Sequence, residues 1–247
     1  MTKSHPSLLF VFLFFFLIFK EGWASEIRVG AVEVSQRGFV DKDGVIRGSS
    51  VEITNLVVTA AGYTPVNKVL PYPRLLRELE LGTLDAALLV PNENVTKIAT
   101  PLAYLQDVEF ILLTKPEDQV DSLDAVSGMK IGHLRRSRIS EKILSSIEVE
   151  SVQGDSYSHM LKLLLKGRLD GLVGTRYNIE FAIQELELNP DSLSQPLTLK
   201  RLELHLVYSK KTAEPEKIDA LTSAANSLAI EAQVQKVVEK YKALPTN

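Results

Sequence analysis

Three arginines and a serine stand together at residues 135–138, and their side chains could bind an anion. Ser137 is predicted to begin a helix, whose first N–H groups lack partners within the helix and bind anions readily. The planar guanidinium of arginine suits a carboxylate or a phosphate. Because neighbouring side chains point in different directions, at least one of Arg135, Arg136 and Arg138 must face solvent. We expect Arg136 and Ser137 to contribute to a binding site.

Arg74 is a second candidate for an anion-binding side chain. It follows Tyr72 and Pro73 at the start of a predicted helix, where the helix dipole is positive and a cation is unfavourable. A ligand carboxylate, or an acid from another part of the fold, would explain a cation in that place. The alternative is a solvated arginine that binds nothing.

The acidic and histidine residues give little support for catalysis. Asp85 and Asp170 could be mistaken for a catalytic pair, but each begins a strand shortly after a glycine, so a turn-stabilising role is predicted. Glu33 and His133 are the remaining candidates for a general acid or base. No nucleophile with a base and an orienting group is visible. We therefore expect a protein that is not an enzyme.

Composition argues against several other classes. The chain has no cysteine and only four histidines, so neither a disulfide nor a transition-metal site is expected, and no cofactor is expected either. The net charge is −3, and no dense run of Lys and Arg offers nucleic acid a surface to hold.

Residues 1–24 are predicted to be a secretory signal peptide. Lys3 precedes an apolar run from Leu8 to Phe19, and Gly22 and Ala24 supply the small residues of a cleavage site after Ala24. The alternative, a permanent membrane anchor, needs about 20 apolar residues. We expect the mature protein to begin at Ser25 and to be periplasmic.

One segment of the chain is repeated. Residues 72–90 and 157–174 share a tyrosine, a leucine-rich helical pattern, a glycine and then Leu-Asp before an apolar strand. Gly82 and Gly167 are placed to end their helices in the left-handed conformation. The repeat favours two similar α/β lobes, although any fold that alternates helices and strands can give such an echo by chance.

Helices and strands are predicted to alternate along the chain, which favours parallel sheets with helices on their faces. A capping box formed by Ser49 and Glu52 would open the first helix, which Gly62 would end. A long helical region, 215–242, carries a break near Glu231. Strands are expected at 27–34, 66–70, 84–90, 108–114, 130–133, 149–152, 169–174 and 203–209, and further helices at 73–81, 137–146, 157–166 and 177–187.

The chain after the leader resembles the family 3 extracytoplasmic solute-binding proteins, the amino-acid-binding type of ABC transporters. The segments that carry the resemblance are 44–53, 79–86, 123–132 with its Gly-Met-Lys-Ile-Gly pattern, 167–170 and 237–241. The resemblance implies the two-lobed "type II" periplasmic-binding-protein fold, an α/β fold in which each lobe is a mostly parallel sheet flanked by helices. Lobe 1 would comprise residues 25–113 and 203–247, lobe 2 residues 114–202, and two hinge strands would join them.

In such sheets the ligand lies beyond the carboxyl ends of the strands. That rule selects the loops 33–39, 70–74, 91–93, 134–137, 153–157 and 175–177. Phe39 could stack on a ligand or could equally be a lid over the core. The predicted ligand-binding residues are Glu33, Phe39, Tyr72, Arg74, Asn92, Arg136, Ser137, Thr175 and Arg176.

The sequence departs from the family at two ligand anchors. The resemblance implies an arginine for the ligand carboxylate near Asn92, where the nearest cation is Lys97, and an acid for the ligand amine at Thr175. A buried zwitterion needs both charges matched. We therefore expect a ligand other than the usual amino acid.

The resulting hypothesis is a monomeric periplasmic protein that captures a small polar solute between two lobes for an ABC-type importer. A protein that senses the ligand and signals to a membrane receptor is the first alternative. A periplasmic enzyme on the same scaffold, resembling a dehydratase, is the second.

Overall fold

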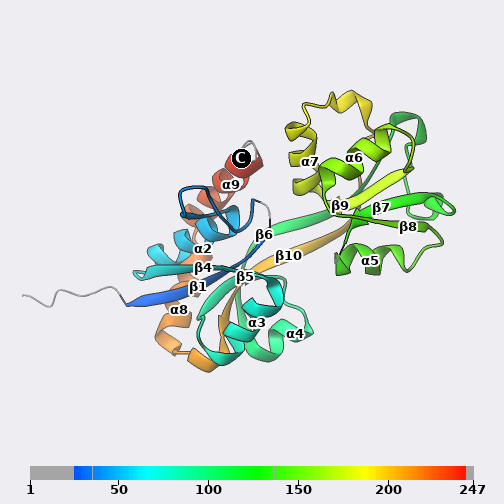
Figure 1. The fold of residues 1–247 in the computed structure, drawn as a ribbon. Helices are drawn as coiled ribbons and strands as arrows, with labels where there is room; N and C mark the ends of the chain where they lie inside the picture. Colours follow the sequence, from blue (N-terminus) through cyan, green and yellow to red (C-terminus); the bar gives the residue numbers. More distant parts are fainter. Residues whose placement is uncertain (1–24, 35, 136, 243–247) are drawn as a thin grey trace, which may run out of the picture.

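The structure, a computed structural model, describes residues 25–34, 36–135 and 137–242. Its main feature is one eight-stranded sheet in the order β4-β1-β5-β10-β6-β9-β7-β8, which runs through two packed halves of the molecule (Figure 1). The long strands β6 (Ala99–Thr114) and β10 (Leu197–Ser209) pair antiparallel with each other and belong to both halves. They carry the chain from one half to the other and back.

The first half is built on parallel strands at one end of the sheet: β1 (Glu26–Val32), β4 (Thr64–Leu70) and β5 (Ala86–Leu89). Its helices are α2 (Ser49–Ala60), α3 (Tyr72–Leu81), α4 (Glu93–Ile98), α8 (Pro215–Ala225) and α9 (Leu228–Lys242). A small hairpin of β2 (Phe39–Val40) and β3 (Ile46–Arg47) precedes α2.

The second half repeats this plan at the other end of the sheet. Its parallel strands are β7 (Lys130–Leu134), β8 (Glu150–Gly154) and β9 (Gly171–Thr175), and its helices are α5 (Arg138–Leu144), α6 (Tyr157–Leu165) and α7 (Arg176–Glu185). Short 3-10 turns lie at Pro116–Asp118, Asp124–Val126, Pro190–Ser192 and Lys210–Thr212.

Each half has hydrophobic clusters of its own. In the first half, one cluster joins β1 to α2, α8 and α9 through residues such as Ile27, Val57 and Leu221, and another packs α3 against the sheet through Leu75 and Leu79. In the second half, α6 and α7 contribute Met160, Leu161, Leu164 and Ile179 to one cluster, while α5 contributes Leu144 to another. Burial of these side chains, worth about 1.5–3 kcal/mol each, fixes the helices to the sheet.

The repeated segment has the same backbone role in both halves, as its pattern predicts. Gly82 and Gly167 follow the repeat helices with φ of 74° and 67°, in the left-handed region. The turn-stabilising role predicted for the aspartates that follow is corrected: each side chain binds a neighbouring strand instead of its own turn. Asp85 accepts a hydrogen bond of 2.9 Å from the Arg28 amide, and Asp170 one of 2.7 Å from the Lys130 amide.

Three further local predictions are corrected by the structure. The predicted capping box is wrong. The N-cap residue of α2 is Gly48, and no side chain forms a hydrogen bond to the start of this helix. Glu52 instead binds Lys240 and Tyr241 of α9. The region 215–242 is two helices, and the break lies at Asn226–Ser227 rather than near Glu231. The strands predicted at 108–114 and 203–209 are longer, because β6 and β10 pair along their whole length from one half to the other.

Within residues 25–242, as far as they are described, no helix is long and apolar enough to cross a membrane. The predicted signal peptide lies outside the described residues.

Candidate functional site

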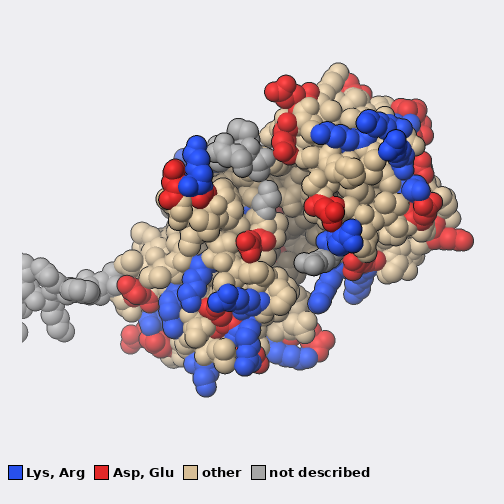
Figure 2. All heavy atoms as spheres, viewed as in Figure 1, with Lys and Arg blue, Asp and Glu red and all other residues tan. Residues whose placement is uncertain are grey.

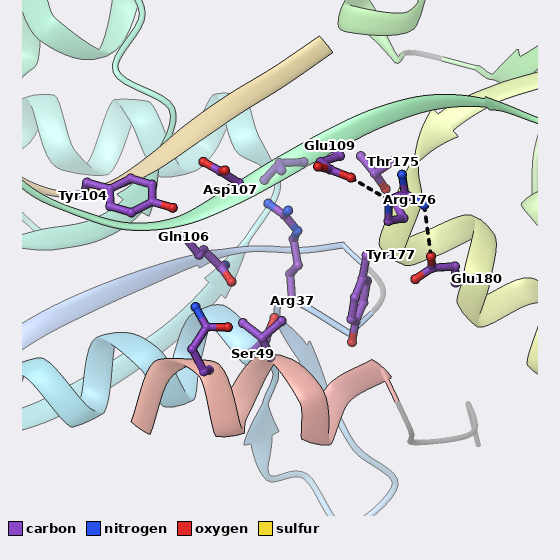
Figure 3. Close-up of a pocket in the computed structure, with 13 residues that line it drawn as sticks. Arg37, Ser49, Tyr104, Gln106, Asp107, Glu109, Thr175, Arg176, Tyr177 and Glu180 are labelled. Atoms are coloured by element: carbon purple, nitrogen blue, oxygen red, sulfur yellow. Dashed lines mark hydrogen bonds and ion pairs between the residues drawn. The ribbon is translucent and has the colours of Figure 1, made fainter. Parts of the chain in front are cut away.

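A cavity of about 330 Å³ lies between the two halves. The visible face of the molecule is hollowed between them (Figure 2). The cavity is lined by side chains from the first half, from the second half and from β6: Arg37, Ser49, Tyr104, Gln106, Asp107, Val108, Glu109, Thr175, Arg176, Tyr177, Glu180, Gln235 and Val238. Figure 3 shows most of these side chains converging from separate elements. Of the loops selected from the sequence, 33–39 and 175–177 reach it.

Glu109, on β6, is the centre of an ion-pair network at one end of the cavity. Its carboxylate accepts hydrogen bonds from Arg176 Nε at 2.5 Å and from Arg201 Nη2 at 2.5 Å. These two bonds hold the pKa of Glu109 below its usual value. Arg176 also lies 3.5 Å from Glu180, and Arg201 3.5 Å from Asp107. Every carboxylate of the cavity therefore has an arginine beside it.

Arg37 enters the cavity from a tightly held loop between β1 and α2. The backbone N–H groups of Ser49 and Ser50 donate to the carbonyls of Gln36 at 2.8 Å and Arg37 at 3.0 Å. Gln36 is buried with φ of 62°, a left-handed conformation that costs a non-glycine residue free energy. Gly48, with φ of 135°, approaches so closely that a Cβ would lie 2.2 Å from the Arg37 carbonyl oxygen. The loop thus fixes the direction of one side chain, that of Arg37.

The Arg37 guanidinium has no hydrogen-bond or ion-pair partner within the described part of the chain. Burial lowers its pKa to about 10, so that it remains charged at neutral pH, and the ionisable groups that face it are the hydroxyls of Tyr177 and Tyr157. Figure 3 shows the side chain standing beside Tyr177 and pointing toward β6. Arg37 is half-buried, and a charge that is partly removed from water without a partner is costly. Such groups concentrate at functional sites.

Tyr177 joins the second half to the first at the side of the cavity. Its hydroxyl donates to the Tyr241 carbonyl at 2.5 Å, near the end of α9. The Tyr241 hydroxyl in turn donates to Glu52 at 2.6 Å and accepts from the Gly48 amide at 3.0 Å. Burial raises the pKa of Tyr177 far above its usual value. Tyr177 therefore connects α7 with the elements that support the Arg37 loop.

Two of the predicted site residues, Thr175 and Arg176, line the cavity. Thr175 is the N-cap residue of α7, and no side chain caps that helix. Arg176 is already paired with Glu109 and Glu180. Arg136 lies outside the described residues.

The other predicted site residues do not line this cavity. Glu33 is exposed, and Phe39 packs against the core of the first half, which is the alternative role considered for it. Arg74 is solvated, as its alternative holds, with 69 % of its side chain exposed and Glu78 at 3.3 Å. The remaining three hold local structure: the Asn92 side chain caps α4 and donates to the Tyr72 hydroxyl, and the Ser137 hydroxyl lies 2.8 Å from that of Ser140.

The candidates for catalysis also lie away from the cavity. Glu33 does not line it, and His133 is buried with one ring nitrogen 3.0 Å from the Leu134 carbonyl and the other 2.9 Å from the Ser151 hydroxyl. Lys97, the cation nearest the missing family anchor, pairs with Glu93 at 2.7 Å on α4. Among the described residues no group of three or more potential ligands could hold a metal ion.

Comparison with known proteins identifies the fold. No protein-family model and no curated protein sequence matches the chain. Solved structures do match. The second substrate-binding domain of *Lactococcus lactis* GlnP in its open conformation superposes with a TM-score of 0.67 at 14 % identity, over 89 % of this chain and 96 % of that one. The chain has a periplasmic-binding-protein-like fold.

Two further structures with this fold show its range. A histidine kinase sensor domain with similarity to periplasmic binding proteins gives a TM-score of 0.65 at 16 % identity, over 91 % of this chain and 99 % of that one. An ancestral amino-acid-binding protein, described as a precursor of cyclohexadienyl dehydratase, gives a TM-score of 0.65 at 14 % identity, over 88 % of this chain and 95 % of that one. The same architecture therefore occurs in a substrate-binding domain, in a sensor domain and in the precursor of an enzyme.

Sequence reasoning missed Arg37, Tyr177 and the residues of β6. The signal for Arg37 and Tyr177 was available, since each lies in a loop selected as facing the ligand. The β6 residues from Tyr104 to Asp107 were missed because the strand was expected to begin at Val108.

Proposed function

We propose that this protein is an exported solute-binding protein, and that a small polar solute binds in the cavity between its two halves. The halves would act as lobes with the limits expected from the sequence, 25–113 with 203–247 and 114–202. The observation that supports the proposal most is the cavity itself, because its walls come from both halves and from β6, which runs between them. Sites at the junction of two packed units are the usual place for small ligands.

The mechanism is a shift of population. A solute that touches both halves binds the closed arrangement more tightly than the open one, and it stabilises the closed arrangement by that difference. In this proposal the solute is bound and released unchanged, and the carboxylates that line the cavity are paired with arginines.

Delivery of the solute to an ABC-type importer is the use we favour, since structural neighbours include domains of such transporters. Sensing for a membrane receptor is the second candidate, and the histidine kinase sensor domain with the same fold is the observation that favours it.

The test is thermal unfolding of the protein secreted from the full chain, with amino acids, di- and tricarboxylates, polyamines, short peptides and sugars. A solute at about 100 times its Kd stabilises the folded state by about 2.7 kcal/mol, which shifts the unfolding midpoint measurably. We expect at least one compound to raise the midpoint.

A matched pair of variants locates the binding site. Gln235 and Gln233 are both exposed on α9, but only Gln235 lines the cavity. Gln235→Trp should fill the cavity and abolish the shift, whereas Gln233→Trp should leave it unchanged. The proposal fails if no compound shifts the midpoint, or if Gln235→Trp binds as well as the unaltered protein.

A further inference from the structure

The charges that line the cavity are unevenly paired. Asp107, Glu109 and Glu180 each have an arginine within 3.5 Å, and these three carboxylates share Arg176 and Arg201. Arg37 is the cavity cation that has no such partner among the described residues. With Arg37 included, three arginines balance three carboxylates around the cavity, and Arg37 is the cation among them that contacts none of the three acids.

A second set of donors faces Arg37 from the other half. The N-terminus of α7 lies at the cavity wall, where Thr175, Arg176 and Tyr177 line it. The first N–H groups of this ten-residue helix have no acceptor within the helix, and no side chain caps them. The Thr175 hydroxyl oxygen is buried at the same wall, beside the Tyr157 hydroxyl. These groups and the helix dipole favour an anion.

Arg37 and this end of α7 line the same cavity. The hydroxyls of Tyr177, in the first turn of α7, and Tyr157, beneath Gly174 of β9, are the ionisable groups that face the guanidinium. Figure 3 shows Arg37 beside Tyr177, with Thr175 on the adjoining wall. The guanidinium of an arginine can donate hydrogen bonds to two oxygens of a carboxylate or a phosphate, while helix N–H groups donate to the same acidic group from another side.

We propose that the solute is a small organic anion whose acidic group is clamped between the Arg37 guanidinium of the first half and the N-terminus of α7 in the second. This inference rests on the proposed function and specifies the class of solute. Because the two donors come from different halves, the anion closes the molecule as it binds.

The proposal is tested by calorimetric titration with acids and their neutral analogues. The probes are mono- and dicarboxylates with the corresponding primary amides, and phosphate monoesters with their alcohols. We expect one of the acids to bind, and its neutral analogue to bind at least about 10- to 100-fold more weakly, as for loss of a charge-assisted hydrogen bond. The two acid series distinguish a carboxylate from a phosphate.

Arg37→Met separates a ligand contact from a structural contact. It should weaken binding of the acid by about 10- to 100-fold, yet leave the unfolding midpoint of the solute-free protein unchanged or raised, because it removes a half-buried charge without a partner among the described residues. Arg37→Lys should retain part of the affinity, and Arg74→Gln, an exposed arginine outside the cavity, should retain all of it.

Four results would overturn the inference. If neutral solutes bind as well as acids, or if Arg37→Met leaves acid binding intact, a solute-binding protein remains but its ligand is not a clamped anion. If Arg37→Met lowers the midpoint of the solute-free protein by many degrees, Arg37 is a structural residue. If nothing in either panel binds, the proposed function itself fails.

Discussion

At the scale of single residues, a buried carboxylate in this protein is stabilised by a neighbour that is close in space but distant in sequence. Asp85 shows this. The residue is 5 % exposed. Its carboxylate accepts hydrogen bonds from the Arg28 amide at 2.9 Å and from Arg28 Nη2 at 2.5 Å, and these bonds join β1 to the start of β5. Burial raises the pKa of Asp85, but the hydrogen bonds from Arg28 outweigh it, and the pKa lies below its usual value.

Asp85→Asn should therefore lower the free energy of unfolding by about 1–3 kcal/mol near neutral pH, measured by urea denaturation. Because the pKa is depressed in the folded state, this contribution is present above the unfolded pKa of about 3.9 and is lost as the pH falls through the folded value. The variant should accordingly show a shallower loss of stability in acid. Asp170→Asn is the control: Asp170 holds the Lys130 amide without an arginine, so we expect a smaller loss. Equal losses in the two variants would contradict the role given to Arg28.

At the scale of elements, the loop between β1 and α2 decides where Arg37 points. Gly48 holds the loop because its φ is positive and because it nearly touches the Arg37 carbonyl. The Tyr241 hydroxyl of α9 also anchors Gly48, because it accepts a hydrogen bond from the Gly48 amide. Helices α2 and α9 therefore hold the Arg37 loop in place.

Gly48→Ala should destabilise the protein by about 2–4 kcal/mol, since the new methyl group meets backbone and not a movable side chain. Gly44→Ala is a matched control, because Gly44 also has positive φ, 78°, but nothing lies within 4 Å of its Cβ position. It should cost only about 1 kcal/mol. Thermal unfolding of both variants measures the difference, and similar losses would mean that the close approach at Gly48 has no effect on stability.

The elements were largely predictable from the sequence, but the cavity was not. Apolar spacing and Gly82 and Gly167 predict the repeat helices and strands, because these depend on neighbours in the chain. The cavity depends on contacts between distant segments: Arg37 lies near Tyr157 and Tyr177, and Glu109 binds Arg176 and Arg201. The sequence around an arginine does not show whether an acid from a distant segment will lie beside it. Arg74 and Arg37 therefore look alike in sequence, although Arg74 is solvated on α3 and Arg37 is half-buried at the cavity.

At the scale of the whole molecule, the contacts between described residues include two polar ones that join the halves at the cavity in addition to the shared strands. Arg176 of α7 binds Glu109 on β6, and the Tyr177 hydroxyl donates to the Tyr241 carbonyl of α9. The second bond spans from one half directly to the other. In our account it favours the closed arrangement before any solute binds.

Tyr177→Phe removes that bond and little else. We expect a larger open population, because the lost bond is worth about 0.5–1.5 kcal/mol. Small-angle X-ray scattering of the solute-free variant should show an increased radius of gyration. Tyr72→Phe is the control, since the Tyr72 hydroxyl bonds only to Asn92 within the first half, at 3.3 Å. An unchanged radius for Tyr177→Phe would show that the bond does not influence closure.

The central claim is that a solute bound between the halves brings them together, and the distance between the halves tests it most directly. The chain has no cysteine, so spin labels on Asn94→Cys and Asp155→Cys would be the only labels, one on each half at exposed positions that follow β5 and β8. Pulsed electron paramagnetic resonance should show a shorter and narrower distance distribution when a solute that raises the unfolding midpoint is added. An unchanged distribution with that solute bound would contradict the claim, because binding would then take place without closing the halves on it.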